Sequence, residues 1–300
     1  MMNFEEFKAW VKENITSKDW KETSQVEISV VKKNNGVSKA GLFIRESGQD
    51  VSPILYLDDY YIHYQNGELL ENVIKKIRDD YNEKVQMAAV KIPNLQEFEN
   101  VRGKIIYRLV NYEKNKELLE DCPHRRLHDL AVTFRWVAHI DDDGVSTSLI
   151  TNRQVKEWGI TVNDLVLAAQ QNTPRLFPAK IIDMEEMLAG KMSFILYPST
   201  IPMYILTNEQ EINGASVLLY GDVLKDFANK KGTDMYILPS SIHEVILLPS
   251  DRINDPTRLL SMVHDANTTV VSIGDVLSDS VYYYDRKTDH ITEIVSDEKM

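Results

Sequence analysis

The sequence predicts an α+β fold with antiparallel sheets and helices layered on one face. Three observations support this class. Alternating apolar runs meet at turn residues, amphipathic runs with helical spacing lie between them, and the C-terminal half repeats a strand, turn, strand and helix. With 300 residues, 43% of them hydrophobic, the chain has enough apolar material for one large or two modest domains.

The N-terminal part predicts a helix, a hairpin and a second helix. Residues 3–14 place their aromatic and aliphatic side chains on one stripe, with charges opposite. Asn35-Gly36 then separates two alternating runs, at 26–33 and 38–45. Both central residues of a type I′ turn need positive φ, which Asn and Gly tolerate, so these runs predict a hairpin. A helical apolar face over residues 68–83 follows.

The middle of the chain predicts a strand, a short helix and a second hairpin, at residues 104–112, 114–121 and 130–151. Two further helices follow. Thr151 is expected to cap the first and Gly159 to end it, and Thr161 is expected to cap the second.

The tip of the second hairpin, Asp141 to Gly144, is acidic and raises the question of a calcium loop. An EF-hand loop with its glycine at Gly144 would need an acidic ligand at position 139 and a glutamate at position 150. The sequence has His139 and Ile150 instead. We therefore interpret the tip as a turn.

The C-terminal half contains a weak internal repeat. Residues 204–232 and 236–267 each show the pattern of a strand, a polar turn, a strand and a helix. In this alignment residues 217–219 correspond to the strand at 246–248. We expect doubled ββα units here, followed by a last hairpin at 281–294.

No low-complexity stretch marks a long linker. A boundary near residues 112–126 gives the expected domains, an N-terminal α+β unit at 1–120 and a C-terminal α+β unit at 121–300.

The charge balance argues against a nucleic-acid partner. Lys and Arg total 34 against 46 Asp and Glu, which gives a net charge of −12. Such a surface repels phosphates. The simplest interpretation is that the negative charge keeps the chain in solution. The alternatives are that the acidic surface binds a basic protein or that it imitates nucleic acid.

Cysteine usage and hydropathy indicate the cytoplasm. The only cysteine is Cys122, so no intramolecular disulfide can form, as is usual in a reducing compartment. The N-terminus lacks the pattern of a signal peptide, and the apolar runs are far shorter than a membrane span. We expect a cytoplasmic protein with no membrane segment.

The segment 236–249, "YILPSSIHEVILLP", offers candidate catalytic residues: Ser241, His243 and Glu244, with His264 and Asp265 further along the chain. A zinc-protease helix would need a second histidine where Leu247 stands, and no G-x-S-x-G motif occurs. Pro239 and the two serines are also good turn residues between strands. A hydrolase is thus the alternative, and a turn is the favoured interpretation.

Cys122, His124 and His128 form a C-x-H-x₃-H pattern that could bind a metal. It supplies only three ligands, whereas structural zinc usually has four. We favour a strand that begins after Pro123, with no metal. The chain also lacks a P-loop, a dinucleotide-binding glycine motif and paired CxxC motifs, so we expect no cofactor.

The stretches "YILTN", "INGASVLLY", "YILPSSIHEVILLP", "NTPRLFPA" and "LSDSVYYYDR" resemble an uncharacterised bacterial domain-of-unknown-function family that is common in gut anaerobes. The resemblance runs over nearly the whole chain. It implies a cytoplasmic bacterial protein and assigns no catalytic residue.

These observations together predict a non-catalytic binding or interaction protein whose partner is another protein. The alternatives are a hydrolase that uses the Ser241, His243 and Glu244 cluster, and an acidic inhibitor that imitates nucleic acid.

Overall fold

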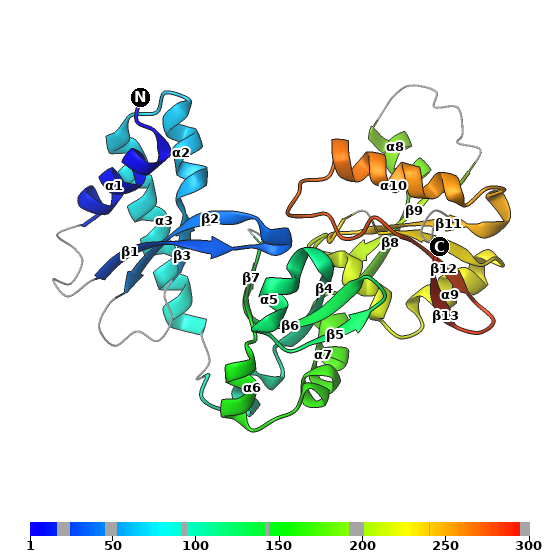
Figure 1. The fold of residues 1–300 in the computed structure, drawn as a ribbon. Helices are drawn as coiled ribbons and strands as arrows, with labels where there is room; N and C mark the ends of the chain where they lie inside the picture. The colour runs from blue at the N-terminus through cyan, green and yellow to red at the C-terminus, as the bar shows by residue number, and fades with distance from the viewer. Residues whose placement is uncertain are drawn as a thin grey trace. The chain divides into compact units, whose positions relative to one another are not determined.

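The structure is a computed structural model, and it describes residues 1–16, 25–45, 53–91, 95–141, 144–191, 201–239 and 241–294. Side chains at 87–91, 141 and 188–191 are outside this description. The acidic residues Asp142 and Asp143 and the turn residue Ser240 also lie outside the described residues. The chain divides into two compact units, residues 1–93 and 94–300 (Figure 1).

The first unit packs three helices on one face of a three-stranded antiparallel sheet, ordered β1-β2-β3. Its elements are α1 (Phe4–Asn14), β1 (Gln25–Lys32), η1 (Asn34–Gly36), β2 (Ser38–Arg45), β3 (Ile54–Tyr56), α2 (Leu57–Gln65) and α3 (Leu70–Lys91). The predicted hairpin is confirmed, because Asn35 and Gly36 both have positive φ. In the core, Phe7 of α1, Leu42 of β2 and Ile77 of α3 are almost fully buried.

The second unit begins with a four-stranded sheet in which β6 is central. Its elements are α4 (Phe98–Arg102), β4 (Ile105–Asn111), η2 (Glu113–Asn115), α5 (Lys116–Glu120), β5 (His124–Leu127), β6 (Leu130–Asp141) and β7 (Gly144–Leu149). Contacts between residues place the boundary of the two units after residue 93, whereas the boundary expected from the sequence follows residue 120. The reason is that β4 pairs with β6, so that residues 112–126 lie in the connection between two paired strands of one sheet.

Two helices, α6 (Asn152–Trp158) and α7 (Val162–Leu176), follow the four-stranded sheet. Thr151 and Thr161 cap them through capping boxes, and Gly159 is left-handed, as predicted. The free edge of β4 is covered by hydroxyl groups. The Tyr107 backbone N–H donates to Thr173 Oγ1 of α7 at 3.2 Å, and the Leu109 N–H donates to Ser216 Oγ at 3.2 Å.

The rest of the unit is a six-stranded sheet of order β13-β12-β10-β11-β9-β8, with antiparallel pairing throughout. The strands are β8 (Ala179–Asp183), β9 (Tyr204–Asn208), β10 (Met235–Leu238), β11 (Val245–Pro249), β12 (Val281–Asp285) and β13 (His290–Ile294). The helices are α8 (Met184–Lys191), η3 (Gly214–Leu219), α9 (Val223–Lys231), η4 (Ser250–Arg252) and α10 (Thr257–Thr269).

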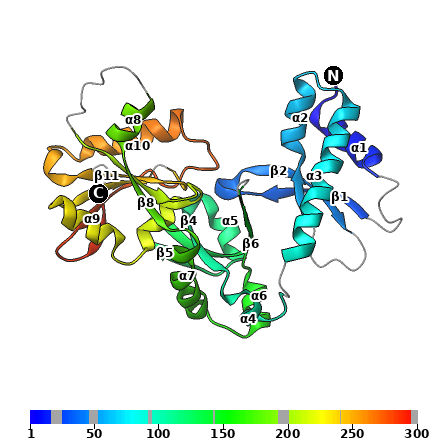
Figure 2. The same cartoon turned by 180° about the vertical axis from the view of Figure 1, so that it is seen from behind.

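The α+β class is confirmed, and the helices of this larger sheet are divided between its two faces rather than confined to one (Figures 1 and 2). Phe227 of α9 packs against Tyr204, with ring centroids 5.0 Å apart. Tyr204 lies opposite Leu247 in the register, so the next residue, Leu248, points to the other face. There it packs against Leu259 of α10.

The internal repeat is only partial. Residues 246–248 lie in β11, as expected, but residues 217–219 lie in the 3-10 helix η3 and not in a strand. Asn213 takes a left-handed conformation at φ 53°, which turns the chain away from β9. Ser216 can then reach the edge of β4 from η3. Tertiary contacts therefore determine the conformation of residues 217–219, although their apolar pattern predicts a strand.

Among the helices within the described ranges, none has the length and apolar character that crossing a lipid bilayer would require.

Candidate functional site

Ser241 lies in the turn that connects β10 and β11. Its side chain is only 5% exposed, and its Oγ accepts a hydrogen bond from the backbone N–H of His243 at 3.0 Å. Ser241 also forms an isolated antiparallel bridge with Val276. The hydroxyl thus stabilises the turn, which is the role that turn chemistry gives to serine.

His243 is held by contacts from three other segments. The backbone N–H of Asn213 donates to Nδ1 at 3.3 Å, and Nε2 lies 3.5 Å from Asp275 Oδ1. The His243 carbonyl oxygen accepts a hydrogen bond from Thr207 Oγ1 at 2.8 Å. Because Nδ1 is an acceptor here, the hydrogen-bond pattern assigns the proton of the neutral ring to Nε2, which faces Asp275. The imidazole is 35% exposed, so this pair lies at the surface.

The remaining candidate catalytic residues are not joined to this pair. Glu244 lines a separate depression beside Lys180 and Ile246. His264 and Asp265 are exposed on α10, where their carbonyl oxygens accept hydrogen bonds from threonine hydroxyls. Among the described contacts, no hydrogen bond or ion pair connects these three residues to Ser241 or to the His243 ring.

Cys122, His124 and His128 have separate surroundings. Cys122 is 1% exposed in an apolar cluster, and burial, despite opposition from Arg135, raises the pKa of its thiol to about 11. His124 Nδ1 is 3.0 Å from the Cys122 carbonyl oxygen, and the His128 ring packs against Tyr282. Within the described part of the chain, no three His, Cys, Asp or Glu side chains gather as a metal ion would require.

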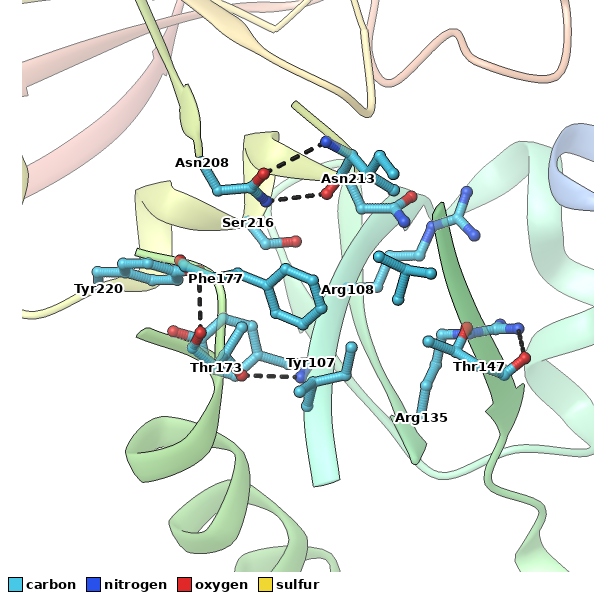
Figure 3. A pocket seen from close by; sticks show the side chains of 13 residues that line it. Tyr107, Arg108, Arg135, Thr147, Thr173, Phe177, Asn208, Asn213, Ser216 and Tyr220 are labelled. Carbon is cyan, nitrogen blue, oxygen red and sulfur yellow. Dashed lines mark hydrogen bonds between the residues drawn. The ribbon is translucent and has the colours of Figure 1, made fainter. Parts of the chain in front are cut away.

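A small pocket of about 20 Å³, room for about one water, lies beside β4, between α7, β7 and the loop that leads into η3 (Figure 3). Its wall contains apolar side chains and a group of hydrogen-bonding side chains. The lining residues are Ile106, Tyr107, Arg108, Arg135, Val145, Thr147, Thr173, Phe177, Asn208, Ile212, Asn213, Ser216 and Tyr220.

Arg108 of β4 and Arg135 of β6 lie on the same face of the sheet. Arg135 is opposite Ile106 in the register, and Ile106 and Arg108 share a face because they are two residues apart. Arg135 donates from Nε to Thr147 Oγ1 at 2.7 Å. Arg108 is half-buried as a residue, but its Nε is fully enclosed and has no hydrogen-bond partner among the residues that the structure describes.

Two positive charges in one enclosed place disfavour each other. Burial, and then the neighbouring Arg135, lower the pKa of Arg108 to about 9, while Asp275 opposes this shift. At neutral pH the Arg108 guanidinium is therefore still charged. Figure 3 shows it beside Asn213, at the end of the pocket near the η3 loop.

The loop that carries Asn213 is fixed in place. Asn208 is 2% exposed, and its amide donates to the Ile212 carbonyl oxygen at 2.8 Å and accepts from the Ile212 N–H at 3.3 Å. Gly214 follows, where a Cβ would clash with the Thr207 hydroxyl and the His243 carbonyl oxygen. Because Asn213 also contacts His243, the pocket borders the His243 and Asp275 pair.

Sequence reasoning did not single out these two arginines. A signal was present, since Arg108 and Arg135 each interrupt an otherwise apolar strand pattern, in "IIYRLV" and "VTFRWV". An arginine inside a buried strand needs a partner.

A family model described as "Family of unknown function (DUF5688)" matches residues 4–286. No curated protein and no solved structure matches the chain. The family match includes the greater part of both units and contains the arginine pocket and the His243 turn. The chain therefore belongs to the DUF5688 family, a family of unknown function.

Proposed function

We propose that this protein acts in the bacterial cytoplasm by binding another protein, without catalysing a reaction. The observation that carries the proposal is a pair of exposed apolar side chains on a fixed loop. Val270 and Ile273 are 81% and 75% exposed, just after α10. Two large apolar side chains exposed on one loop form a small apolar surface, and contiguous apolar surface is a feature of protein-binding sites.

The loop at residues 270–276 is tied to the β10–β11 turn. The Ile242 N–H donates to the Asp275 carbonyl oxygen at 2.8 Å, and Val276 bridges to Ser241. The pair formed by Asp275 and His243 lies at the base of the same loop. A preformed loop loses little conformational entropy when a partner binds, which favours its use as a docking element.

The charge and the cysteine support the rest of the proposal. The net charge of −12 favours a partner with a basic surface and increases the rate of their encounter. The single cysteine is a buried thiol, which fits a reducing compartment such as the cytoplasm.

The experiment is affinity capture from the native host, followed by mass spectrometry, with three forms of the tagged protein. The test variant combines Val270→Asp and Ile273→Asp. The matched control is Leu167→Asp, which adds a charge at an apolar residue of α7 that is 59% exposed. We expect wild type and the control to retain one protein at near-stoichiometric yield, and the test variant to lose it. Equal recovery by all three forms would contradict the proposal.

A hydrolase is the second candidate, because His243 and Asp275 form the imidazole and carboxylate pair that such enzymes use. Ser241 is the obvious nucleophile, but its buried hydroxyl faces a backbone N–H. The purified chain should be assayed with ester, peptide and phosphoester substrates. Hydrolysis that falls by about 100-fold or more in both Ser241→Ala and His243→Ala would establish the enzyme and refute the binding proposal.

A further inference from the structure

We propose that the free edge of β8 and the apolar depression beside it bind an extended segment of a partner protein, which adds to the six-stranded sheet as a further strand. The segment would place a large apolar side chain opposite Ile182 and carry basic residues at its ends. This surface shares no residue with the Val270 and Ile273 loop, so the inference does not depend on the proposed function.

The backbone of β8 is unpaired on one side. β8 is the last strand of the sheet, and among the described strands it pairs with β9 alone. The Met184 N–H donates to the Met203 carbonyl oxygen at 3.0 Å, which shows that the even-numbered residues of β8 face β9. The odd-numbered residues, Ala179, Ile181 and Asp183, therefore direct their N–H and carbonyl groups away from the sheet. Within the described ranges, no hydrogen bond reaches these outward groups.

The exposure of β8 agrees with an open border. All residues of β8 are partly exposed, whereas in the neighbouring β9 every residue except Ile205 is buried. The edge of β4 differs, because the hydroxyls of Thr173 and Ser216 already bond to it. A regular strand with unpaired N–H and carbonyl groups is a template for another strand. β8 therefore offers the backbone half of a peptide-binding site.

The apolar depression supplies contacts for side chains, and its volume is about 490 Å³. Ile182, Ile205 and Ile246 lie opposite one another on β8, β9 and β11 and form one row across its floor. All three are partly exposed, and Met184 and Met187 of α8 also line the depression. A strand added beside β8 would place the side chain opposite Ile182 on the same face, so a large apolar residue there would continue the row.

The charges around β8 select a basic segment. The cation of β8, Lys180, is bonded to Glu211 at 2.7 Å. Carboxylates are more numerous: on β8, in the first turn of α8, on the loop after β9 and in the depression lie Asp183, Glu185, Glu186, Glu209, Glu211 and Glu244. Such exposed charges contribute little affinity individually, but they attract partners of opposite sign and exclude others. We therefore expect Lys or Arg at the ends of the segment.

The same charges argue against a second copy of this chain as the occupant. Pairing β8 with β8 of another molecule would bring Asp183, Glu185 and Glu186 of both copies to one border. Like charges at close range are unfavourable, and each chain already carries a net charge of −12. A basic segment of another protein meets no such repulsion.

The probe is the peptide KRVTVTVRK, amidated at its C-terminus and labelled with a fluorophore at its N-terminus. Its binding to the full chain is measured by fluorescence anisotropy. As a strand, the peptide carries its valines on one face and its threonines on the other. In one changed peptide serine replaces the valines, and in another glutamate replaces the basic residues. We expect each of these to bind at least about tenfold more weakly than the probe.

N-methylated peptides test the strand pairing itself. When the valines point to the depression, the threonine N–H groups face β8 and the valine N–H groups face away from it. N-methylation of both threonines should therefore weaken binding at least about tenfold, because it removes the donors to β8. N-methylation of the first and last valines removes the same number of donors on the other side. This matched peptide should bind within about threefold of the probe.

Ile181→Pro tests the edge of β8 on the protein. It removes an outward N–H and places a ring where the added strand would lie, while the bonds to β9 stay intact. We expect it to weaken binding of the probe at least about tenfold. If this variant fails to fold, the two N-methylated peptides decide the question with the wild type.

Val30→Pro is the matched control, because it changes a border strand of the other sheet. The Lys33 N–H donates to the Val37 carbonyl oxygen at 2.7 Å, so the even-numbered residues of β1 direct their N–H groups away from β2. Val30 is one of these, and it is 68% exposed. We expect this variant to bind the probe as the wild type does.

No binding of the probe up to about 1 mM would overturn the proposal. Equal binding of the glutamate peptide or of the threonine-methylated peptide would do the same, as would full binding by Ile181→Pro. Self-association of the wild type that is lost in Ile181→Pro, measured by analytical ultracentrifugation, would assign the edge to a second copy instead. The variant with Val270→Asp and Ile273→Asp should bind the probe as the wild type does, so failure of that loop to capture a partner leaves this result unchanged.

Discussion

The hydroxyl of Tyr282 donates a hydrogen bond to the carboxylate of Asp129, and this contact joins the two sheets of the second unit. Tyr282 belongs to β12, whereas Asp129 lies in the turn between β5 and β6. The same carboxylate accepts a second bond from Ser278 Oγ at 2.6 Å. Burial, followed by the negative charge of Asp129, raises the pKa of Tyr282, which therefore remains a donor.

We predict that Tyr282→Phe lowers the free energy of unfolding by about 1.5–3 kcal/mol, because it removes a hydrogen bond to a charged acceptor at a buried site. Tyr283→Phe is the control. Tyr283 is next on the strand and bonds to Asp234 at 2.8 Å, but it is less buried. Tyr283→Phe should therefore lower the free energy of unfolding by less than about 1 kcal/mol. Urea unfolding measures both values, and equal losses would contradict this account.

Gly214→Ala should destabilise the protein by about 1–3 kcal/mol, because overpacking forces the backbone to shift. The added Cβ would lie 2.8 Å from the Asn208 nitrogen and would clash with the His243 carbonyl oxygen. Gly221→Ala places the same methyl group where nothing lies within 4 Å. Thermal unfolding of the two variants should therefore differ, and a similar unfolding temperature for both would refute the packing argument.

The thiol of Cys122 should react slowly in the native protein. With a pKa of about 11, only about one thiol in a thousand is ionised at pH 8, and the side chain is 1% exposed. We expect iodoacetamide to label it at least about 100-fold faster in guanidinium chloride than in buffer. Mass spectrometry measures the labelled fraction over time. Rapid labelling of the native protein would contradict this prediction and would show that the apolar cluster around Cys122 opens readily.

Asp279 should contribute to the pH dependence of stability. Burial opposes ionisation, but bonds from Asn267 Nδ2 at 2.8 Å and Lys114 Nζ at 3.2 Å outweigh it and lower the pKa of the carboxyl group from 3.8. The unfolded chain then binds a proton at a higher pH than the folded chain. The stabilisation is present above pH 3.8 and is lost as the pH falls through the lower native value.

The measurement compares the free energy of unfolding at pH 7 with that at low pH, for wild type and Asp279→Asn. The carboxylate is 52% exposed, so water screens the pair and its contribution should stay below about 1 kcal/mol. Asp265→Asn, an exposed position on α10, is the control. A wild-type pH dependence no steeper than that of Asp279→Asn would refute the assignment.

Local chemistry explains which elements could be predicted from the sequence. The hairpin at Asn35-Gly36 and the caps at Thr151 and Thr161 depend on residues close in the chain, and the structure contains them. The run at 217–219 has the same apolar character as a strand. Its 3-10 conformation depends on contacts with β4, which no local pattern reports.

The pocket could not be predicted for a related reason. Strand pairing between β4 and β6 brings Arg108 and Arg135 together, and the register of distant strands is not written in either segment alone. The turn at Ser241 was interpreted from its residue types. Its partner loop, with Asp275, comes from beyond α10, and no local pattern connects that loop with His243.

The covered edge of β4 has a further consequence. An unpaired strand at the border of a sheet can recruit the same strand of another molecule and start an ordered aggregate. Here two outward N–H groups, at Tyr107 and Leu109, are already bound to the hydroxyls of Thr173 and Ser216. An incoming strand would have to displace both, so this border resists fibril growth for as long as the helix and the 3-10 turn stay folded.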